Sequence, residues 1–359
     1  MYFKFVSHFE IRYSSFHFST CLISPSYNIS ATNCRGCITN GINYMTFSIF
    51  LFVAGILILY FGAEWTVKGS SNIAMFLGIR PIIIGLTIVS IGTSLPELVV
   101  SVVAAINKSK DIALGNIIGS NIANIGLVLG LSAIIKPLKI STPTIKKEIP
   151  IMIGVSLLLY VLAMDRNISQ MDGIILFIGI VFFIIYCVYD AKHSNESEKG
   201  NAVDLDSTGK KEHSVPHELL ITTAGLIGIV LGAKLMVDSA VFIARTFGLS
   251  ELFIGMTIVA VGTSLPELAT SMVAAYKDKM EISVGNVIGS NIFNICMVIG
   301  LVSIVSPFDV DQVTLNREFL IMLAFSILVL PLAMHDKTLT RAKGVLFFLG
   351  YGGFIWFTI

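Results

Sequence analysis

The sequence predicts an all-α polytopic membrane protein whose ten transmembrane helices form two inverted five-helix repeats. Its composition is the first reason, because 55% of the 359 residues are hydrophobic and only 13% are charged, whereas charged residues make up about a quarter of a typical soluble domain. The second is that ten apolar segments, each near the roughly 20 residues that a spanning helix needs, fit between Met45 and Ile359. The apolar composition makes the lipid bilayer the expected partner, and the net charge of +1 argues against a nucleic-acid partner.

The third reason is an internal duplication at a constant offset of 170 residues. Residues 85–131 match residues 255–301 without a gap, with 28 identities in 47 positions. Gly62 corresponds in this way to Gly232, and Gly78 to Gly248. Five spans per copy is an odd number, so the second copy enters the membrane from the opposite face. We therefore expect a pseudo-two-fold axis that lies in the membrane plane.

In chain order, the sequence divides into four parts. Residues 1–44 are an extension without a clear period, and Met45 opens an apolar helix, so translation from Met45 is one hypothesis. Residues 45–190 form the first repeat, 191–216 a linker and 217–359 the second repeat. The expected helices of the first repeat are 45–66, 72–107 with a break, 112–135, 147–164 and 171–190. Those of the second repeat are 217–236, 241–276 with a break, 282–306, 316–334 and 341–358.

The linker is rich in charged and small polar residues, which is typical of a tether. Its acids leave open a regulatory metal-binding loop: Glu196, Glu198, Asp204 and Asp206. Cys34 and Cys37 form a lone C-x-x-C without a second pair, which is a weak indication of a zinc or redox site.

Loop charge predicts the orientation of the helices. If the linker is cytoplasmic, the inside loops hold 15 lysines and arginines and the outside segments hold 6. Without the four linker lysines the ratio is still 11 to 6. The positive-inside rule therefore predicts a protein of the cell membrane with its linker in the cytoplasm and both ends of the ten-helix core on the extracellular side.

The heptapeptide Gly-Thr-Ser-Leu-Pro-Glu-Leu occurs at 92–98 and again, letter for letter, at 262–268. A proline cannot continue a helix cleanly, so each copy predicts a helix break within an apolar segment. Unwound backbone inside a membrane survives only beside protein or a water-lined cavity. We expect the carbonyls around Ser90 and Ala260 to lack an intrahelical partner and to serve as ligands.

Each heptapeptide also places an acid, Glu97 or Glu267, within the bilayer. Such a residue costs several kcal/mol and is functional by default. Threonine and serine hydroxyls lie within about one helical turn of each acid, at Thr93, Ser94, Thr263 and Ser264. Oxygen ligands of this kind suit hard cations such as Ca²⁺. Neither heptapeptide contains cysteine or histidine, which disfavours zinc, copper and iron.

A second motif pair stands at 115–124 and 285–294. Ser120 and Asn124 are four residues apart and share a helix face, as do Ser290 and Asn294, so these side chains can complete an oxygen cage. Gly115 and Gly119 leave a face without bulk, where another helix can approach. For the other four asparagines we favour helix-to-helix hydrogen bonds: Asn116, Asn121, Asn286 and Asn291.

With these two motif pairs the chain resembles the cation/Ca²⁺ exchanger superfamily, and most closely its prokaryotic sodium/calcium antiporters, over residues 45–359. The resemblance implies four central cation sites and no cofactor or enzymatic activity, with Na⁺ influx driving Ca²⁺ out of the cell. It implies that Glu97 and Glu267 hold Ca²⁺ together with the carbonyls of Thr93 and Thr263. The implied Na⁺ ligands are the side chains of Ser94, Ser120, Ser264 and Ser290 and the carbonyls of Ser90 and Ala260.

One position departs from part of the family, which carries aspartate where this chain has Asn294. The central site then holds two carboxylates and two amides, Asn124 and Asn294, and two negative charges balance Ca²⁺. The proton-coupled branch typically has Gly-Asn-x-x-Glu in place of Gly-Thr-Ser-x-Pro-Glu, so the resemblance favours sodium.

We expect alternating access, because Na⁺ and Ca²⁺ compete for overlapping oxygens, with residues 47–65 and 219–237 as the moving pair. No obligate protein partner is evident. Exchange of H⁺ for Ca²⁺, or K⁺-dependent Na⁺/Ca²⁺ exchange, on the same scaffold is an alternative. A cation channel is another. An intramembrane hydrolase is a third, but no His, Cys or Lys near the two acids supplies its chemistry.

Overall fold

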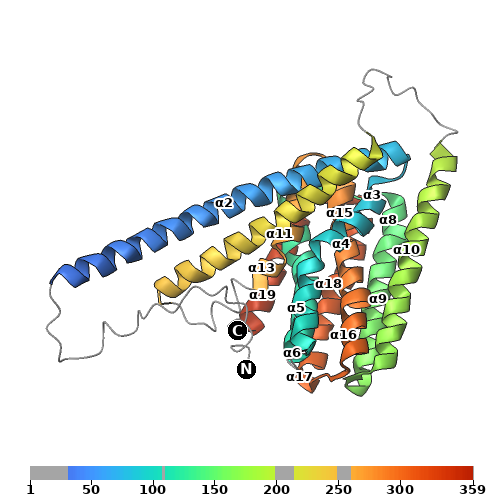
Figure 1. Cartoon of the computed structure of the whole chain (residues 1–359). Helices are drawn as coiled ribbons and strands as arrows, with labels where there is room; N and C mark the ends of the chain where they lie inside the picture. The colour runs from blue at the N-terminus through green and yellow to red at the C-terminus, as the bar shows by residue number, and fades with distance from the viewer. Residues whose placement is uncertain (1–30, 107–109, 199–213, 249–259, 359) are drawn as a thin grey trace.

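The computed structural model describes residues 31–106, 110–198, 214–248 and 260–358, and these residues are mainly helical. Two long helices, α2 (Ala31–Leu77) and α11 (Val215–Thr246), lie side by side and slant across one end of the remaining bundle (Figure 1). They approach closely through glycines, because a Cβ on Gly62 would lie 2.7 Å from the backbone nitrogen of Ile229. A Cβ on Gly232 would lie 2.6 Å from that of Leu59. Only glycine allows this backbone contact.

The bundle contains shorter elements from both halves of the chain. Those of the first half are α3 (Pro81–Ile84), η1 (Gly85–Val89), α4 (Ser90–Thr93), α5 (Leu95–Ile106), α6 (Lys110–Ala123), η2 (Asn124–Leu129), α7 (Gly130–Ile135), β1 (Leu138–Lys139), α8 (Thr142–Lys146), α9 (Glu148–Leu162), η3 (Ala163–Asp165), β2 (Asn167–Ile168) and α10 (Gln170–Glu198). Those of the second half are α13 (Ala260–Thr263), α14 (Leu265–Tyr276), α15 (Met280–Phe293), η6 (Asn294–Ile299), α16 (Gly300–Val305), β3 (Phe308–Asp309), α17 (Gln312–Asn316), α18 (Glu318–Met334), β4 (Thr338–Leu339) and α19 (Arg341–Thr358).

Several expected helix boundaries are wrong. Helix α2 begins at Ala31 instead of Met45. It continues to Leu77 instead of residue 66, because the helix ends only at Gly78, which has a positive φ of 62°. The next helix then begins at Pro81 and not at 72. Helix α11 likewise continues past 236 to Thr246, before Gly248 at φ 76°. Residues 191–198 extend α10, so the expected linker is partly helical.

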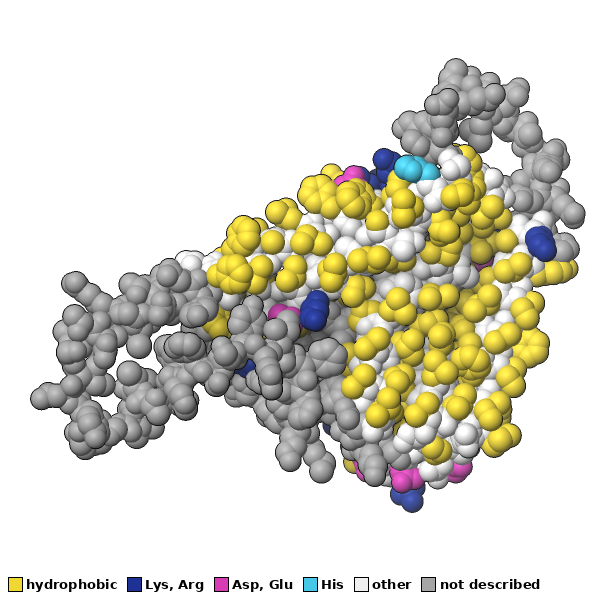
Figure 2. Space-filling model, viewed as in Figure 1, with side chains coloured by type: hydrophobic (Ala, Val, Ile, Leu, Met, Phe, Trp, Pro, Cys, Tyr) yellow, Lys and Arg dark blue, Asp and Glu magenta, His cyan; other side chains and the backbone are white. Residues whose placement is uncertain are grey.

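Among the described residues, seven helices are long and apolar enough to cross a membrane, and the bent pair α3–α5 would make eight. Hydrophobic side chains cover the flank of the bundle, whereas charged side chains gather mainly at its ends (Figure 2). This distribution fits a lipid-facing flank between two aqueous faces. The seven segments are Met45–Leu77, Ala113–Ile135, Thr142–Asp165, Gln170–Lys192, Val215–Thr246, Met280–Val305 and Gln312–Met334.

Two of these segments form the centre of the bundle. The best spanning windows of Ala113–Ile135 and Met280–Val305 are each 83% buried, against 22 to 33% for the other five. Short antiparallel strand pairs, β1 with β4 and β2 with β3, join the two halves. Ser156 and Ser326, which correspond at the offset of 170, lie 3.4 Å apart between their hydroxyl oxygens. The two halves therefore pack around a shared centre that carries both copies of the second motif.

Candidate cation site

Both expected helix breaks are present, and both have the same backbone conformation. Helix α4 ends at Thr93, Ser94 has φ −87° and ψ 8°, and α5 resumes at Leu95 with a bend of 45°. In the second copy, Ser264 has φ −89° and ψ 5° between α13 and α14. Proline two residues further on removes a backbone donor, which explains why the helix breaks here.

One expectation for the breaks is wrong. The carbonyl of Ser90 does have an intrahelical partner, since it accepts a hydrogen bond from the backbone N–H of Ser94 at 3.0 Å. Pro96 removes the donor for the residue four positions earlier, which is Gly92 and not Ser90. The hydroxyl of Thr93 also contacts the carbonyl oxygen of Ser90 at 3.4 Å, so the Ser90 carbonyl has two partners within its own segment. Ala260 is the first residue of α13, and its side chain lies outside the described atoms.

The two acids meet at the centre of the bundle. Glu97 is 1% exposed and Glu267 is fully buried. The hydroxyl of Ser94 donates to Oε1 of Glu267 at 2.8 Å, which links the two copies of the heptapeptide directly. Thr93 and Ser290 are near the Glu267 carboxylate, and Glu97 lies within electrostatic reach of Glu267. Two buried carboxylates in one place are stable in their ionised form only with a compensating positive charge.

A cross-copy network holds Thr93 against the second half. Its hydroxyl contacts Oδ1 of Asn286 at 3.1 Å. The amide nitrogen of Asn286 donates to Ser271 at 3.0 Å and to the carbonyl of Glu267 at 3.4 Å. In the first half, Asn116 donates to Ser101 at 3.0 Å, which is the same contact moved by 170 residues. The expected helix-to-helix bonding of these two asparagines is therefore confirmed.

The amides of the second motif lie where the central helices change their winding. A π-helical turn begins at Asn124 and another at Asn294, in η2 and η6. Turns of this kind are rare and frequently mark functional sites. The sequence reasoning missed them, and the glycine that follows each turn, at 130 and 300, is the only local signal.

Small residues on α15 let the site-bearing helices approach. A Cβ on Gly285 would lie 2.6 Å from the carbonyl oxygen of Ile82, and a Cβ on Gly289 would lie 2.6 Å from the hydroxyl of Ser90. We also expected a helix to approach closely at Gly115 and Gly119. A Cβ on either glycine would meet no described atom of another segment within 4 Å. By the offset of 170, the segment expected to approach these two glycines is 252–260, the counterpart of 82–90. All of it except residue 260 lies outside the described residues.

The site contains a group of buried oxygens that lack a hydrogen-bond donor among the described residues. Buried polar atoms are nearly always partnered, so each such atom needs an explanation. These oxygens come from both halves and from both motifs, and all belong to residues that the sequence singled out. They are Oε1 and Oε2 of Glu97, Oε2 of Glu267, Oδ1 of Asn124, Oδ1 of Asn294 and the hydroxyls of Ser264 and Ser290.

Of the remaining candidates, Ser120 is buried on the same helix as Asn124, and Thr263 is half-buried at the end of α13. Among the described residues, no three His, Cys, Asp or Glu side chains gather into a metal-binding group. The donor set is therefore dominated by neutral oxygens around two carboxylates, which matches the preference of hard cations.

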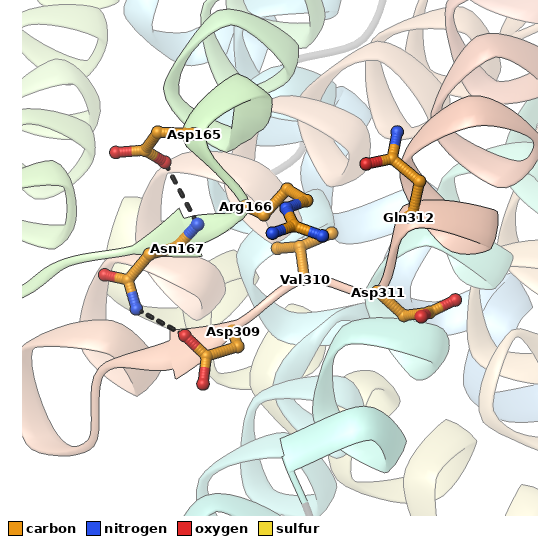
Figure 3. A pocket seen from close by; sticks show the side chains of 7 residues that line it. All are labelled: Asp165, Arg166, Asn167, Asp309, Val310, Asp311 and Gln312. Carbon is orange, nitrogen blue, oxygen red and sulfur yellow. Dashed lines mark hydrogen bonds between the residues drawn. The ribbon is translucent and has the colours of Figure 1, made fainter.

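A separate pocket of 460 Å³ lies at the end of the bundle that carries β2 and β3 (Figure 3). Its acids serve local structure. Asn167 donates its side-chain amide to Asp309 at 2.8 Å and its backbone N–H to Asp165 at 3.0 Å. Asp311 caps α17 by accepting from the N–H of Val313. The pocket shares no residue with the oxygen group at the helix breaks.

The chain is similar to proteins with known names along nearly their whole length. Sodium/calcium exchanger MaX1 of Methanosarcina acetivorans is 32% identical over 344 residues, which cover 87% of this chain and 98% of that protein. Inner membrane protein YrbG of Escherichia coli is 35% identical over 308 residues, with coverage of 85% and 94%. The solved structure of the sodium-calcium exchanger NCX_Mj soaked with 2.5 mM Na⁺ and 0.1 mM Ca²⁺ matches with a TM-score of 0.73, 35% identity and coverage of 85% and 96%.

The family model described as sodium/calcium exchanger protein matches residues 47–190 and 217–359, and so it spans both halves of the chain. The family is one of exchangers, which are transporters. With the model covering most of the chain and relatives above 30% identity along nearly their whole length, the chain belongs to the sodium/calcium exchanger protein family.

Proposed function

We propose that this protein exchanges Na⁺ for Ca²⁺ across the cell membrane by alternating access and extrudes Ca²⁺. The observation that carries the proposal is the meeting of Glu97 and Glu267 in a buried group of oxygens without donors. Two carboxylates neutralise one Ca²⁺, and the neighbouring amide and hydroxyl oxygens supply further ligands. The similarity to NCX_Mj, a sodium-calcium exchanger, supports the choice of ions.

In this proposal Ca²⁺ lies between Glu97 and Glu267, with Asn124, Asn294 and the carbonyls of Thr93 and Thr263 around it. Na⁺ ions occupy flanking positions. The Na⁺ ligands are Ser94, Ser120, Ser264, Ser290 and the carbonyls of Ser90 and Ala260.

Exclusion between the two ions produces exchange. The hydrogen bond from Ser94 to Glu267 means that a ligand for Na⁺ and a ligand for Ca²⁺ touch each other. An ion that draws the carboxylate toward itself removes that oxygen from its competitor. The empty site keeps two uncompensated buried charges, which disfavours a change of facing without an ion. An electrogenic cycle gains about 2.3 kcal/mol per charge per 100 mV from the membrane potential.

We infer that ten spans form two inverted repeats, with the linker in the cytoplasm and the ends of the core outside the cell. Hydrogen bonds that recur at the offset of 170 support the repeat, as in the pairs Asn116–Ser101 and Asn286–Ser271. An odd number of spans per repeat then inverts the second copy.

We infer that α2 and α11 move together during exchange. Their glycine contacts join them along their length, so they slide as one body. Helix α11 covers both helix breaks, since a Cβ on Gly92 would meet Leu226 at 2.5 Å and a Cβ on Gly262 would meet Val237 at 2.5 Å. An ion pair between Glu64 of α2 and Lys277 at the end of α14 ties this pair of helices to the bundle.

The test is calcium-45 uptake into proteoliposomes of the full-length protein under imposed Na⁺, K⁺ or H⁺ gradients. We expect uptake that requires internal Na⁺ and that ceases when the Na⁺ gradient is removed. Uptake driven by a pH gradient without Na⁺ would replace Na⁺ by H⁺ as the coupling ion. Uptake that needs no counter-ion would instead indicate a channel and overturn the proposal.

A further inference from the structure

The two site amides are held by asparagines from the opposite half of the chain. Nδ2 of Asn124 donates to Oδ1 of Asn291 at 3.0 Å, and Nδ2 of Asn294 donates to Oδ1 of Asn121 at 3.3 Å. The two bonds are equivalent, because replacing each residue by its counterpart 170 residues away in the other half turns one bond into the other. Oδ1 of Asn124 and Oδ1 of Asn294 are both buried and have no donor among the described residues. Each site amide therefore directs its NH₂ group to the partner and keeps its carbonyl oxygen free.

The partner asparagines are themselves oriented by methionines. Nδ2 of Asn121 contacts the sulfur of Met322 at 3.7 Å, and Nδ2 of Asn291 contacts the sulfur of Met152 at 3.7 Å. A thioether sulfur can accept a hydrogen bond but has no proton to donate. It therefore favours the NH₂ side of the amide over the carbonyl side.

We propose that Asn121 and Asn291, each backed by a methionine, are positioning residues that set which end of the site amides faces the cation. The proposal rests on the proposed function, because it requires a cation between the two glutamates. Oδ1 of Asn291 can only accept a hydrogen bond, and within the Asn124 amide only the NH₂ group can donate one. Asn124 therefore turns its carbonyl oxygen away from Asn291 and into the site. Asn121 acts on Asn294 in the same way.

Orientation matters here because the two ends of an amide act oppositely on a cation. A flipped Asn124 would withdraw an oxygen ligand and direct two N–H donors at a positive charge. Bulk water cannot easily replace the lost oxygen ligand, since all four asparagines are 1% exposed or less. Residues that orient metal ligands typically contribute about 10- to 100-fold to affinity.

The test measures Ca²⁺ binding to the purified full-length protein by calorimetry in detergent. We expect Asn291→Leu to raise the Ca²⁺ dissociation constant by about 10- to 100-fold. The same substitution is then made in an Asn124→Asp background. A carboxylate has two equivalent oxygens and needs no orienting partner, so Asn291→Leu should change the affinity of Asn124→Asp by no more than about twofold.

Ser303→Ala serves as a control for the loss of a buried polar group, because Ser303 bonds only to carbonyls of its own helix in the described structure. It should leave Ca²⁺ affinity unchanged. If Asn291→Leu fails to fold, Met152→Leu keeps the volume and removes the acceptor, and it should weaken Ca²⁺ binding in the same direction. Wild-type affinity in Asn291→Leu, or an equal loss in both backgrounds, would overturn the inference alone. No Ca²⁺ binding by the wild-type protein would overturn the proposed function with it.

Discussion

The substitution Glu97→Gln removes one full negative charge from a side chain that is 1% exposed and whose two carboxylate oxygens have no donor among the described residues. Its shape hardly changes. The difference from wild type therefore reports the charge that Glu97 contributes to the cation. Glu267 is a less clean choice, because Ser94 already donates to it at 2.8 Å and this bond also holds the two halves together.

The magnitude follows from the burial of the charge. Removing one partner of a buried ion pair costs about 3–5 kcal/mol, since the other charge is left uncompensated. For Ca²⁺ held between two carboxylates, this corresponds to binding that is weaker by about 150- to 4,000-fold. Ca²⁺ transport should then be lost at concentrations that saturate the wild-type protein.

The assay combines Ca²⁺ titration of the purified protein with calcium-45 uptake into proteoliposomes. Glu148→Gln is the matched control, because Glu148 is also 1% exposed but pairs with Arg80 at 3.3 Å, away from the helix breaks. The control should lower the melting temperature and leave the Ca²⁺ affinity unchanged. A Glu97→Gln protein that binds Ca²⁺ within about threefold of wild type, a change below 1 kcal/mol, would refute a central role for Glu97.

Three further substitutions follow from the geometry. Asn294→Asp adds a third acid to the site, so the Na⁺ or pH dependence of uptake should change, and an unaltered profile would place this residue outside the site. Ser94→Ala removes the donor to Glu267, a bond to a charged group worth about 1.5–3 kcal/mol, so the melting temperature should fall and half-saturation by Na⁺ should rise. Gly62→Leu forces a side chain into a position where even a Cβ would lie 2.7 Å from the backbone of α11. It should slow turnover and lower thermal stability without weakening Ca²⁺ binding, and normal turnover would contradict a joint movement of α2 and α11.

The sequence predicted the features that depend on local chemistry. The breaks at Ser94 and Ser264 were foreseen because proline acts on the backbone within one helical turn. The meeting of Glu97 and Glu267 was expected because an acid that is duplicated in apolar surroundings needs a shared partner. Both inferences use only residue type and spacing, which the sequence contains in full.

The features that the sequence did not predict depend on contacts between distant segments. Helices α2 and α11 exceed their expected lengths, and they pack on each other through glycines such as Gly62 and Gly232. A composition window of about 20 residues cannot anticipate such contacts. The π-helical turns at Asn124 and Asn294 likewise occur inside sequences that read as regular helix. Arg80 bonds to Asp190 at 2.9 Å across 110 residues of chain, a pairing without any local signal.

The cross-half contacts at the site lie within the duplicated segments 85–131 and 255–301. Ser94 of the first half bonds to Glu267 of the second, and Asn291 of the second half orients Asn124 of the first. Neither half can assemble a complete oxygen group alone, because each supplies ligands whose orientation depends on the other. A change in one half therefore alters its own ligand and also the partner of a ligand in the opposite half.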